Sequence, residues 1–304
     1  MNIASIDIGT NTVLLLIAEI DTSRKELKPL YNRYEIPRIG KGVASSGYIS
    51  EEKIEVLTRI LTDYANEARK YNCNEIIVSG TYPFRAAKNG NAVIEMIEKS
   101  IAVRITSLSG EKEANLSFIG AISDISFSGN VCVIDIGGGS TELIFGNNSE
   151  ILAKKSAPIG VVNQTEELVK SQPVSLSELD EIRGIIQNKI KSYYPLHIPT
   201  NKVIAIAGTP TTLACMKLGL PNFDEEKIHK ECLSRNEIEQ FVESFAVLDN
   251  FSIKEKYSAI VQGREDVILM GSILLVEAMD FLRANEVVVS SRGLRYGAII
   301  YKYF

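Results

Sequence analysis

Residues Val131–Gly146, VCVIDIGGGSTELIFG, join two apolar runs through three glycines and a serine. Apolar runs separated by so short a stretch of Gly and Ser predict two strands that form a hairpin with a tight turn. Such a turn leaves its backbone N–H groups unobstructed, and a concave set of N–H donors binds anions. We therefore expect this turn to bind phosphate through Gly137, Gly138, Gly139 and Ser140.

A second copy of the pattern lies near the start of the chain. Ile6–Thr12, IDIGTNT, is followed by the apolar run Val13–Ile17, which again predicts a strand, a turn and a strand. One such hairpin alone indicates no more than a tight turn, whereas two copies in one chain favour anion binding at both. The first turn would contribute Gly9, Thr10, Asn11 and Thr12. The repeat also predicts two related halves.

The rest of the chain alternates between helical and strand patterns. A helix is expected after Ser50, because its apolar positions form one stripe: Ile54, Leu57, Leu61, Tyr64 and Ala68. Further strands are expected at 76–78, 101–108, 203–207 and 286–290. Further helices are expected at about 110–124, 175–192, from 209, 234–247, 265–284 and up to 303. This mixture predicts two α/β domains with a cleft between them.

Composition limits the class of protein. The 304 residues suggest two domains, and 45% hydrophobic residues with 23% charged residues suit a packed core. The net charge of −5 argues against a nucleic-acid partner, because phosphate backbones are bound through an excess of Lys and Arg. The sequence has neither about 18 consecutive apolar residues nor a signal-peptide pattern. We therefore expect a soluble, cytoplasmic protein that does not bind a membrane.

Several kinds of site are excluded by the residues present. Two histidines in the whole chain make a histidine-based triad improbable, and the four cysteines lie far apart with no CxxC pair. No GxxxxGK[ST] stretch occurs, which excludes a P-loop.

Three acidic residues lie beside the two predicted turns. Asp7 and Asp135 end apolar runs, where a carboxylate without a partner is costly to bury. They either cap the turn or hold a cation, commonly Mg²⁺ when phosphate is near, and the sequence leaves both alternatives open. Glu142 occupies the position that Leu14 holds in the first copy. It is either a solvent-facing strand residue or a general base that takes a proton from water.

Shorter signals mark further candidates. Arg85 follows a predicted strand in GTYPFRAAKNG, and its planar guanidinium suits phosphate, although a surface arginine without a role fits the spacing equally well. Glu113 lies near the start of a predicted helix, where acids are favoured in any case. The third glycine turn, IAGTPTTLA at 206–214, runs into a helix N-terminus. Gly208 and Thr209 there either bind phosphate or only start the helix.

Eight motifs are spread in order from Ser5 to Ile299: SIDIGTNT, RIGKGVASSGYISEE, GTYPFRAAKNG, LSGEKEA, VIDIGGGSTEL, IAGTPTTLA, GREDVILMGSILL and SSRGLRYGAI. Together they resemble the exopolyphosphatase and guanosine pentaphosphate phosphatase family of the actin, sugar kinase and Hsp70 superfamily. The resemblance implies two ribonuclease H-like α/β domains with an active-site cleft between them. We place the first domain at 1–124 plus about 297–304, and the second at 125–296.

The resemblance also implies roles for individual residues. The two catalytic glutamates of the family fall on Glu113 and Glu142. Both hairpin turns and Arg85 would contact phosphate, with Mg²⁺ assisting. The implied reaction is the hydrolysis of a terminal phosphoanhydride in inorganic polyphosphate or pppGpp, by water that a glutamate activates.

Two departures from the family's pattern bear on the substrate. Longer relatives continue beyond the position of Phe304 into a helical region that helps hold long polymers, so we expect a preference for short polyphosphate or pppGpp, or weak processivity. Pro210 stands where many relatives carry glycine, which weakens the case for a nucleotide contact at the third turn.

Two other functions fit parts of the sequence. A kinase of the same superfamily would present a paired-glycine turn for adenosine, whereas 206–214 contains only Gly208. A non-catalytic sensor would bind polyphosphate or pppGpp without turnover, and the presence of both glutamates argues against it. The choice of substrate and a homodimer are left open; the aliphatic stretch 265–284 could form core or interface, and core is favoured.

Overall fold

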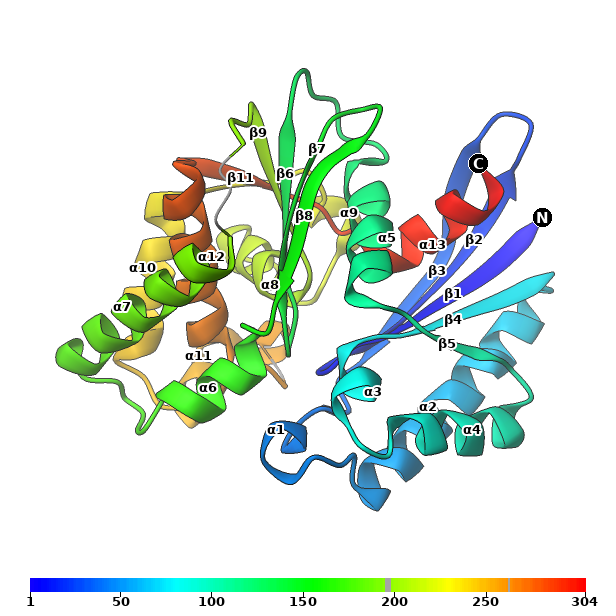
Figure 1. Cartoon of the computed structure of the whole chain (residues 1–304), viewed down its shortest axis with the longest axis horizontal. Helices are drawn as coiled ribbons and strands as arrows, with labels where there is room; N and C mark the ends of the chain where they lie inside the picture. The colour runs from blue at the N-terminus through cyan, green and yellow to red at the C-terminus, as the bar shows by residue number, and fades with distance from the viewer. Residues whose placement is uncertain (195–197, 262) are drawn as a thin grey trace. The chain divides into compact units, whose positions relative to one another are not determined.

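The chain forms two compact units in a computed structural model that describes residues 1–194, 198–261 and 263–304. The first unit combines Met1–Ser123 with Arg292–Phe304, and the second is Asp124–Ser291 (Figure 1). The backbone therefore passes between the units twice. We expected the second passage near 297, but the division in the structure falls before Arg292, so the whole of the last helix belongs to the first unit.

A five-stranded sheet in the order β3-β2-β1-β4-β5 forms the centre of the first unit. β2 is antiparallel to both neighbours, while β4 and β5 run parallel to β1. The strands are β1 Asn2–Ile8, β2 Val13–Asp21, β3 Glu26–Glu35, β4 Glu75–Gly80 and β5 Ile105–Ser107. Three antiparallel strands followed by two strands parallel to β1 form the arrangement of a ribonuclease H-like sheet.

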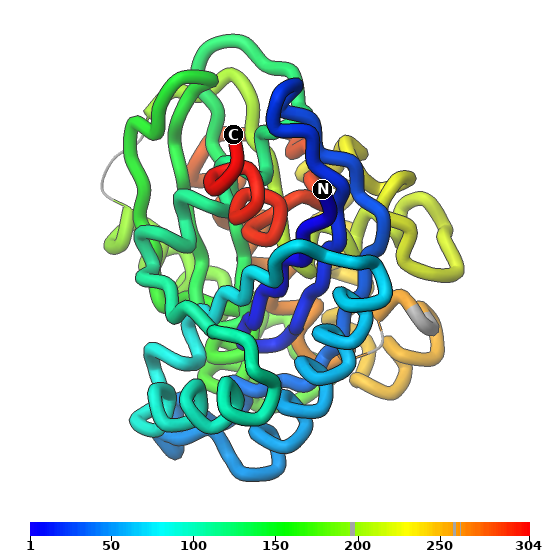
Figure 2. Tube along the Cα trace, turned by 90° about the vertical axis from the view of Figure 1, so that its right-hand side faces the viewer, coloured from blue at the N-terminus to red at the C-terminus, as the bar shows by residue number. Residues whose placement is uncertain are grey.

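Both faces of this sheet are covered, because four consecutive residues of β1, whose side chains point to opposite faces in turn, are buried. The helices are α1 Val43–Ser46, α2 Glu51–Lys70, α3 Tyr82–Ala86, α4 Gly90–Ile101, α5 Gly110–Ile122 and α13 Leu294–Tyr303. Ala4 and Ile6 share a core with residues of α2 and α4. Ile3, in contrast, packs with Tyr296 and Ile299 of α13. Figure 2 shows α13, in red, beside the blue strands of this sheet.

Glycines allow α5 and α13 to cross at very short range. A Cβ atom on Gly297 would lie 1.8 Å from the carbonyl oxygen of Leu116, and one on Gly120 would lie 2.1 Å from the carbonyl oxygen of Gly293. Any larger residue would force the two helices apart. The segment 292–304 is therefore built into the first unit by close backbone contact.

The second unit repeats the sheet of the first and adds one strand, in the order β10-β11-β9-β6-β7-β8. β6 and β7 form the antiparallel hairpin, and β9 runs parallel to β6. The strands are β6 Val131–Ile136, β7 Thr141–Gly146, β8 Ile151–Ala157, β9 Lys202–Ile206, β10 Cys232–Ser234 and β11 Glu286–Val289. The fold is thus duplicated, as the sequence repeat predicted.

Seven helices of the second unit lie within the described ranges, and α12 is the central one. They are α6 Val161–Leu168, α7 Leu176–Tyr193, α8 Gly208–Lys217, α9 Glu225–Ile228, α10 Arg235–Ala246, α11 Asn250–Val261 and α12 Ile268–Leu282. α12 packs against α6, α7, α8 and α10 and is buried almost throughout, so the aliphatic stretch is core. Among the described residues, no helix is long and apolar enough to cross a membrane.

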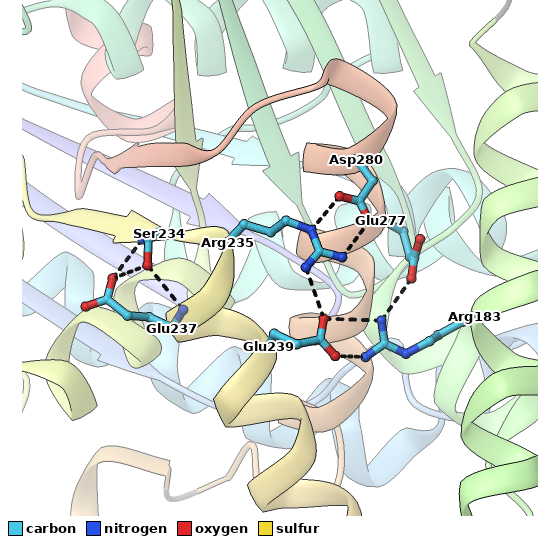
Figure 3. Close-up of polar contacts among 7 residues, drawn as sticks. All are labelled: Arg183, Ser234, Arg235, Glu237, Glu239, Glu277 and Asp280. Atoms are coloured by element: carbon cyan, nitrogen blue, oxygen red, sulfur yellow. Dashed lines mark hydrogen bonds and ion pairs between the residues drawn. The ribbon is translucent and has the colours of Figure 1, made fainter.

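A network of charged side chains joins three of these helices (Figure 3). Arg183 on α7 contacts Glu277 on α12 at 3.2 Å and also bonds to Glu239 on α10. Arg235 on α10 donates two hydrogen bonds to Asp280 on α12, at 2.5 and 2.8 Å. The network joins α7 and α10 to α12.

The structure corrects several expected elements. The strand expected at 101–108 is only β5, because α4 continues to Ile101 and ends at Ala102 in the left-handed region, with φ of 54°. The helix expected from 265 begins at Ile268. β3 and β8 were not predicted at all; both are edge strands with many polar, exposed residues.

Candidate functional site

The two glycine turns are closed by the same hydrogen bond. In the first, the Gly9 N–H donates to the Thr12 carbonyl oxygen at 2.9 Å; in the second, Gly137 donates to Ser140 at 2.9 Å. The flanking strands pair up to Ile8 in one hairpin and up to Ile136 in the other. Each predicted phosphate-binding turn therefore occupies an equivalent position in its own unit.

Helix α6 closes one side of the second turn. The N–H groups of Val161 and Val162 donate to the carbonyl oxygens of Gly137 and Gly138, at 3.0 and 2.8 Å. The Asn163 amide donates to the carbonyl oxygen of Gly139 at 3.0 Å. Because C=O and N–H point in opposite directions across a trans peptide, the N–H groups of residues 138–140 face away from α6. These three donors form a row that suits an anion.

This approach of α6 depends on a glycine that sequence reasoning missed. A Cβ atom on Gly160 would lie 2.4 Å from backbone atoms of Gly138 and Gly139. No side chain larger than hydrogen fits there without displacing the turn. Its only sequence signal is a glycine shortly after an apolar run, which by itself is unremarkable.

The segment after β3 supports the first turn in the same way. The N–H groups of Gly40 and Arg38 donate to the carbonyl oxygens of Thr10 and Asn11, at 2.9 and 3.0 Å. The N–H groups of Asn11 and Thr12 therefore face the opposite side. The Asn11 Oδ1 atom is buried and accepts no hydrogen bond from the described residues. A buried amide oxygen of this kind suits a cation or a donor that arrives with a ligand.

Arg85 and Glu113, two candidates 28 residues apart, meet in the first unit. Arg85 lies on α3, whose start is fixed by hydrogen bonds from Thr81 to the carbonyl oxygen of Ile8, at the end of β1. Its Nη1 donates to Glu113 Oε2 at 2.8 Å and to the carbonyl oxygen of Leu108 at 2.6 Å. Two acceptors on one nitrogen fix the plane of the guanidinium. Arg85 is thus not an unengaged surface arginine.

Glu142 is buried, with only 2% of its surface exposed. This excludes the solvent-facing alternative. On β7 it pairs with Asp135 of β6 on one side and with Ser156 of β8 on the other, and the Ser156 hydroxyl donates to Glu142 Oε1 at 2.5 Å. The preceding residue, Thr141, accepts a hydrogen bond of 2.5 Å on its carbonyl oxygen from the Tyr194 hydroxyl. Burial, followed by the charge of Glu142, raises the pKa of Tyr194, so this hydroxyl remains a donor.

Asp7 and Asp135 are half-buried at equivalent positions, each two residues before the first glycine of its turn. Asp135 and Glu142 are direct cross-strand partners, so two carboxylates share one face of the sheet. Among the described residues no group of three His, Cys, Asp or Glu side chains could hold a metal. Mg²⁺ commonly needs only one or two carboxylates beside phosphate oxygens and water, and adjacent like charges favour a cation. The residues present therefore fit Mg²⁺.

The third turn lies between β9 and α8. Ala207 has a φ of 76°, a conformation that is costly for a residue with a side chain. A Cβ atom on Gly208 would lie 2.9 Å from the Arg264 guanidinium, which places that arginine against the turn. Thr209 is buried, and its hydroxyl lies 2.2 Å from where a Cβ atom on Gly271 of α12 would be. The side chain of Thr209 thus packs on α12, and phosphate binding at this turn stays a prediction.

The candidates form two sets, one in each unit. Asp7, the first turn, Arg85 and Glu113 belong to the first unit; Asp135, the second turn, Glu142, Gly208 and Thr209 belong to the second. The structure brings together Arg85 with Glu113, and Asp135 with Glu142. The cleft expected between the domains stays a prediction.

Two sheets with the same strand order, each opening with a hairpin whose glycine turn presents backbone donors, define a protein with two ribonuclease H-like domains. Comparison with known proteins narrows the class. The chain belongs to the Ppx/GppA phosphatase family, whose profile matches residues 16–303.

Three comparisons show the extent of the similarity. A bifunctional 3-dehydroquinate synthase/phosphatase of Fusobacterium nucleatum is 33% identical over 98% of this chain, which spans 46% of that protein's length. Exopolyphosphatase 2 of Mycobacterium tuberculosis is 31% identical over 92% of this chain and 91% of its own. The crystal structure of the Aquifex aeolicus member of the Ppx/GppA family superimposes with a TM-score of 0.85 at 26% identity, covering 99% of this chain and 97% of the other.

Proposed function

We propose that this chain is an exopolyphosphatase, which releases orthophosphate from the end of inorganic polyphosphate. The observation that carries the proposal is the buried Glu142, held by a hydrogen bond two residues beyond a turn of outward-facing backbone donors. Membership of a phosphatase family supports hydrolysis, and the M. tuberculosis relative is named for this activity. The chain covers less than half of the F. nucleatum relative, so the first activity in that protein's name is not transferred.

The chemistry needs little covalent participation from the protein. Backbone N–H groups of the glycine turns and the Arg85 guanidinium would neutralise the charge of the terminal phosphoryl group. Glu142 would take a proton from a water molecule as the water oxygen attacks the terminal phosphorus. The bond from that phosphorus to the bridging oxygen then breaks, which leaves orthophosphate and a polymer one unit shorter.

The contact between Arg85 and Glu113 supports a role for both residues. A guanidinium has five N–H donors, and the described contacts to Glu113 and Leu108 use only Nη1. The planar fork can therefore bind phosphate while Glu113 holds it in place. We propose that Glu113 orients Arg85 in addition to the catalytic role expected from the resemblance.

Mg²⁺ is proposed as the cofactor. Asp135 in the second unit would hold it, with Asp7 as the equivalent candidate in the first. When bound, the ion would neutralise charge on the phosphate oxygens. Removing divalent cations with a chelator should therefore abolish turnover, and added Mg²⁺ should restore it.

The proposal is tested by measuring orthophosphate release from short polyphosphate, long polyphosphate and pppGpp with Mg²⁺ present. The wild-type protein should release phosphate from at least one substrate, and Glu142→Gln should reduce kcat by about 100-fold or more. Glu150→Gln is a matched control, because Glu150 is exposed in the turn that joins β7 to β8. An unimpaired Glu142→Gln would remove Glu142 from the role of base.

The same assay separates the alternatives. A kinase would transfer phosphate only when a sugar or carboxylic acid acceptor is added, and a sensor would bind polyphosphate tightly without turnover. The substrate with the highest kcat/KM would distinguish exopolyphosphatase from pppGpp phosphohydrolase activity, and the sizes of partly digested polymers would report processivity. The cytoplasmic location, the lack of membrane and nucleic-acid partners, and a homodimer stay predictions.

A further inference from the structure

A row of three polar side chains crosses the sheet of the second unit. Asp135 on β6, Glu142 on β7 and Ser156 on β8 are direct cross-strand partners, so all three point to the same face. On β6 and β7 the neighbouring residues are mostly apolar and buried, whereas on β8 Ser156 follows Lys154 and Lys155. The two carboxylates are therefore exceptions in two mostly apolar strands.

The first unit shows what this row looks like without the glutamate. The equivalent partners there are Asp7, Leu14 and Tyr34, in the same register relative to the glycine turn. The duplicated fold keeps the first aspartate and changes the other two positions together, to Glu142 and Ser156 in the second unit. A hydroxyl thus appears on β8 in the unit where a carboxylate appears on β7.

The contact between these two side chains is short and directed. The Ser156 hydroxyl donates to Glu142 Oε1 at 2.5 Å, within the range of about 2.5–2.7 Å for a hydroxyl that bonds to an ionised carboxylate. The bond fixes the carboxylate, which is 2% exposed, at one oxygen.

We propose that Ser156 is a positioning residue for Glu142: its hydroxyl holds the buried carboxylate in the orientation that accepts a proton from water. The inference rests on the proposed function, because it assigns Ser156 a task only if Glu142 is the base. Ser156 touches neither water nor phosphate in this role; it acts through the carboxylate.

The test compares kcat and KM of the full chain, with polyphosphate as substrate, for the wild-type protein, Ser156→Ala and Ser156→Thr. Ser156→Ala should lower kcat by roughly 10- to 100-fold, the size of a lost hydrogen bond to a charged group, and leave KM nearly unchanged. Ser156→Thr keeps the hydroxyl and should restore most of kcat.

Lys155→Ala is the matched control, because Lys155 lies next along β8 and pairs with Leu143, on the opposite face. It should change neither kcat nor KM. Thermal unfolding of each variant shows whether a loss of activity comes from unfolding. If Ser156→Ala does not fold, the kcat of Ser156→Thr provides the readout.

The possible results separate failure of the Ser156 role from failure of the proposed exopolyphosphatase function. If Glu142→Gln is inactive while Ser156→Ala keeps the wild-type kcat, the positioning role is wrong and the exopolyphosphatase proposal stands. A Ser156→Ala that only lowers the unfolding temperature, with an unchanged kcat, likewise overturns the inference. If Glu142→Gln is fully active, both proposals fail together.

Discussion

Glu277 is a carboxylate on α12, a helix that is buried almost throughout. Burial raises the pKa of Glu277, while a hydrogen bond from Gln187 and the charge of Arg183 act in the opposite direction. An ion pair so deeply buried adds little to stability, because desolvation offsets the attraction. Removing one partner, in contrast, strongly destabilises the fold, because the other charge is then buried without compensation.

Arg183→Met should therefore destabilise the protein by about 3–5 kcal/mol at pH 7. This loss of unfolding free energy should shrink as the pH falls toward 5. Without Arg183 the pKa of Glu277 is raised further, so Glu277 takes up a proton in the folded variant at a pH where it is still ionised in the unfolded chain. Urea unfolding at both pH values measures this. Arg235→Met is the control: its partner Asp280 is about 40% exposed, so the expected loss is about 0–1 kcal/mol. Equal losses for the two variants would contradict the argument.

At the scale of the element, each glycine turn is shaped by the segment packed behind it. α6 binds the carbonyl oxygens of the second turn, and the segment at Arg38–Gly40 binds those of the first. The turns alone do not determine which way their N–H groups face. The supporting segments do, because they occupy the carbonyl side.

Two glycines that differ only in their surroundings test this. Gly160→Ala should cost about 1–3 kcal/mol and reduce phosphate release, because its Cβ atom would meet the backbone of Gly138 at 2.4 Å. Gly184→Ala, inside α7, meets no atom within 4 Å and should stabilise the protein by about 0.5–1 kcal/mol. Chemical unfolding and the phosphate-release assay measure both. A Gly160→Ala that is as active and as stable as wild type would show that the close approach of α6 is dispensable.

The parts of the fold that were predicted from sequence are those with periodic apolar patterns. The two hairpins, α2, α7, α10 and β9 all bury one face or lie in the core. β3 and β8 were missed because an edge strand has fewer neighbours and tolerates polar residues on both faces, so its pattern resembles a loop. β5 was overextended because Ile101 belongs to the preceding helix, which ends in a turn that the sequence does not mark.

At the candidate site, too, local sequence patterns identify residues but not the contacts between them. The glycine turns and the acids near them carry a local signal, and Arg85 and Glu113 were named from motifs. That Arg85 and Glu113 would touch depends on the packing of α3 against α5, which no local pattern encodes. Ser156 and Gly160 were missed because each acts through a partner brought to it by the fold: Glu142 across the strands, and Gly138 across the turn.

At the scale of the whole molecule, one side chain holds both passages of the backbone between the units. Asp124 and Ser291 are the first and last residues of the second unit. His229 Nε2 bonds to the Asp124 carboxylate at 2.9 and 3.0 Å, and its Nδ1 accepts from the Ser291 N–H at 3.2 Å. The exposed Lys230 adds an ion pair to Asp124 at 3.1 Å. His229 thus ties the two passages to each other.

His229→Ala should release both passages at once. Limited proteolysis should then cut the chain near Asp124 and Ser291 about tenfold faster. This factor is expected because the loss of roughly one hydrogen bond lowers the free energy of local opening. Lys230→Ala, which removes only the exposed ion pair, should be cut at the wild-type rate. Unchanged cleavage of His229→Ala would mean that the passages are held by other contacts.

The place of α13 has a consequence for how the protein is made. Ribosomes release the chain from its N-terminus, and the first domain of most proteins can fold while later ones are still being translated. Here one face of the first sheet is covered partly by α13, which is translated only after the whole second unit. At about 5–20 residues per second, the nascent first unit waits roughly 10–30 s with that apolar face incomplete. The second unit is contiguous in sequence and can finish folding first. The unit whose translation begins first would then be the one that completes its fold last.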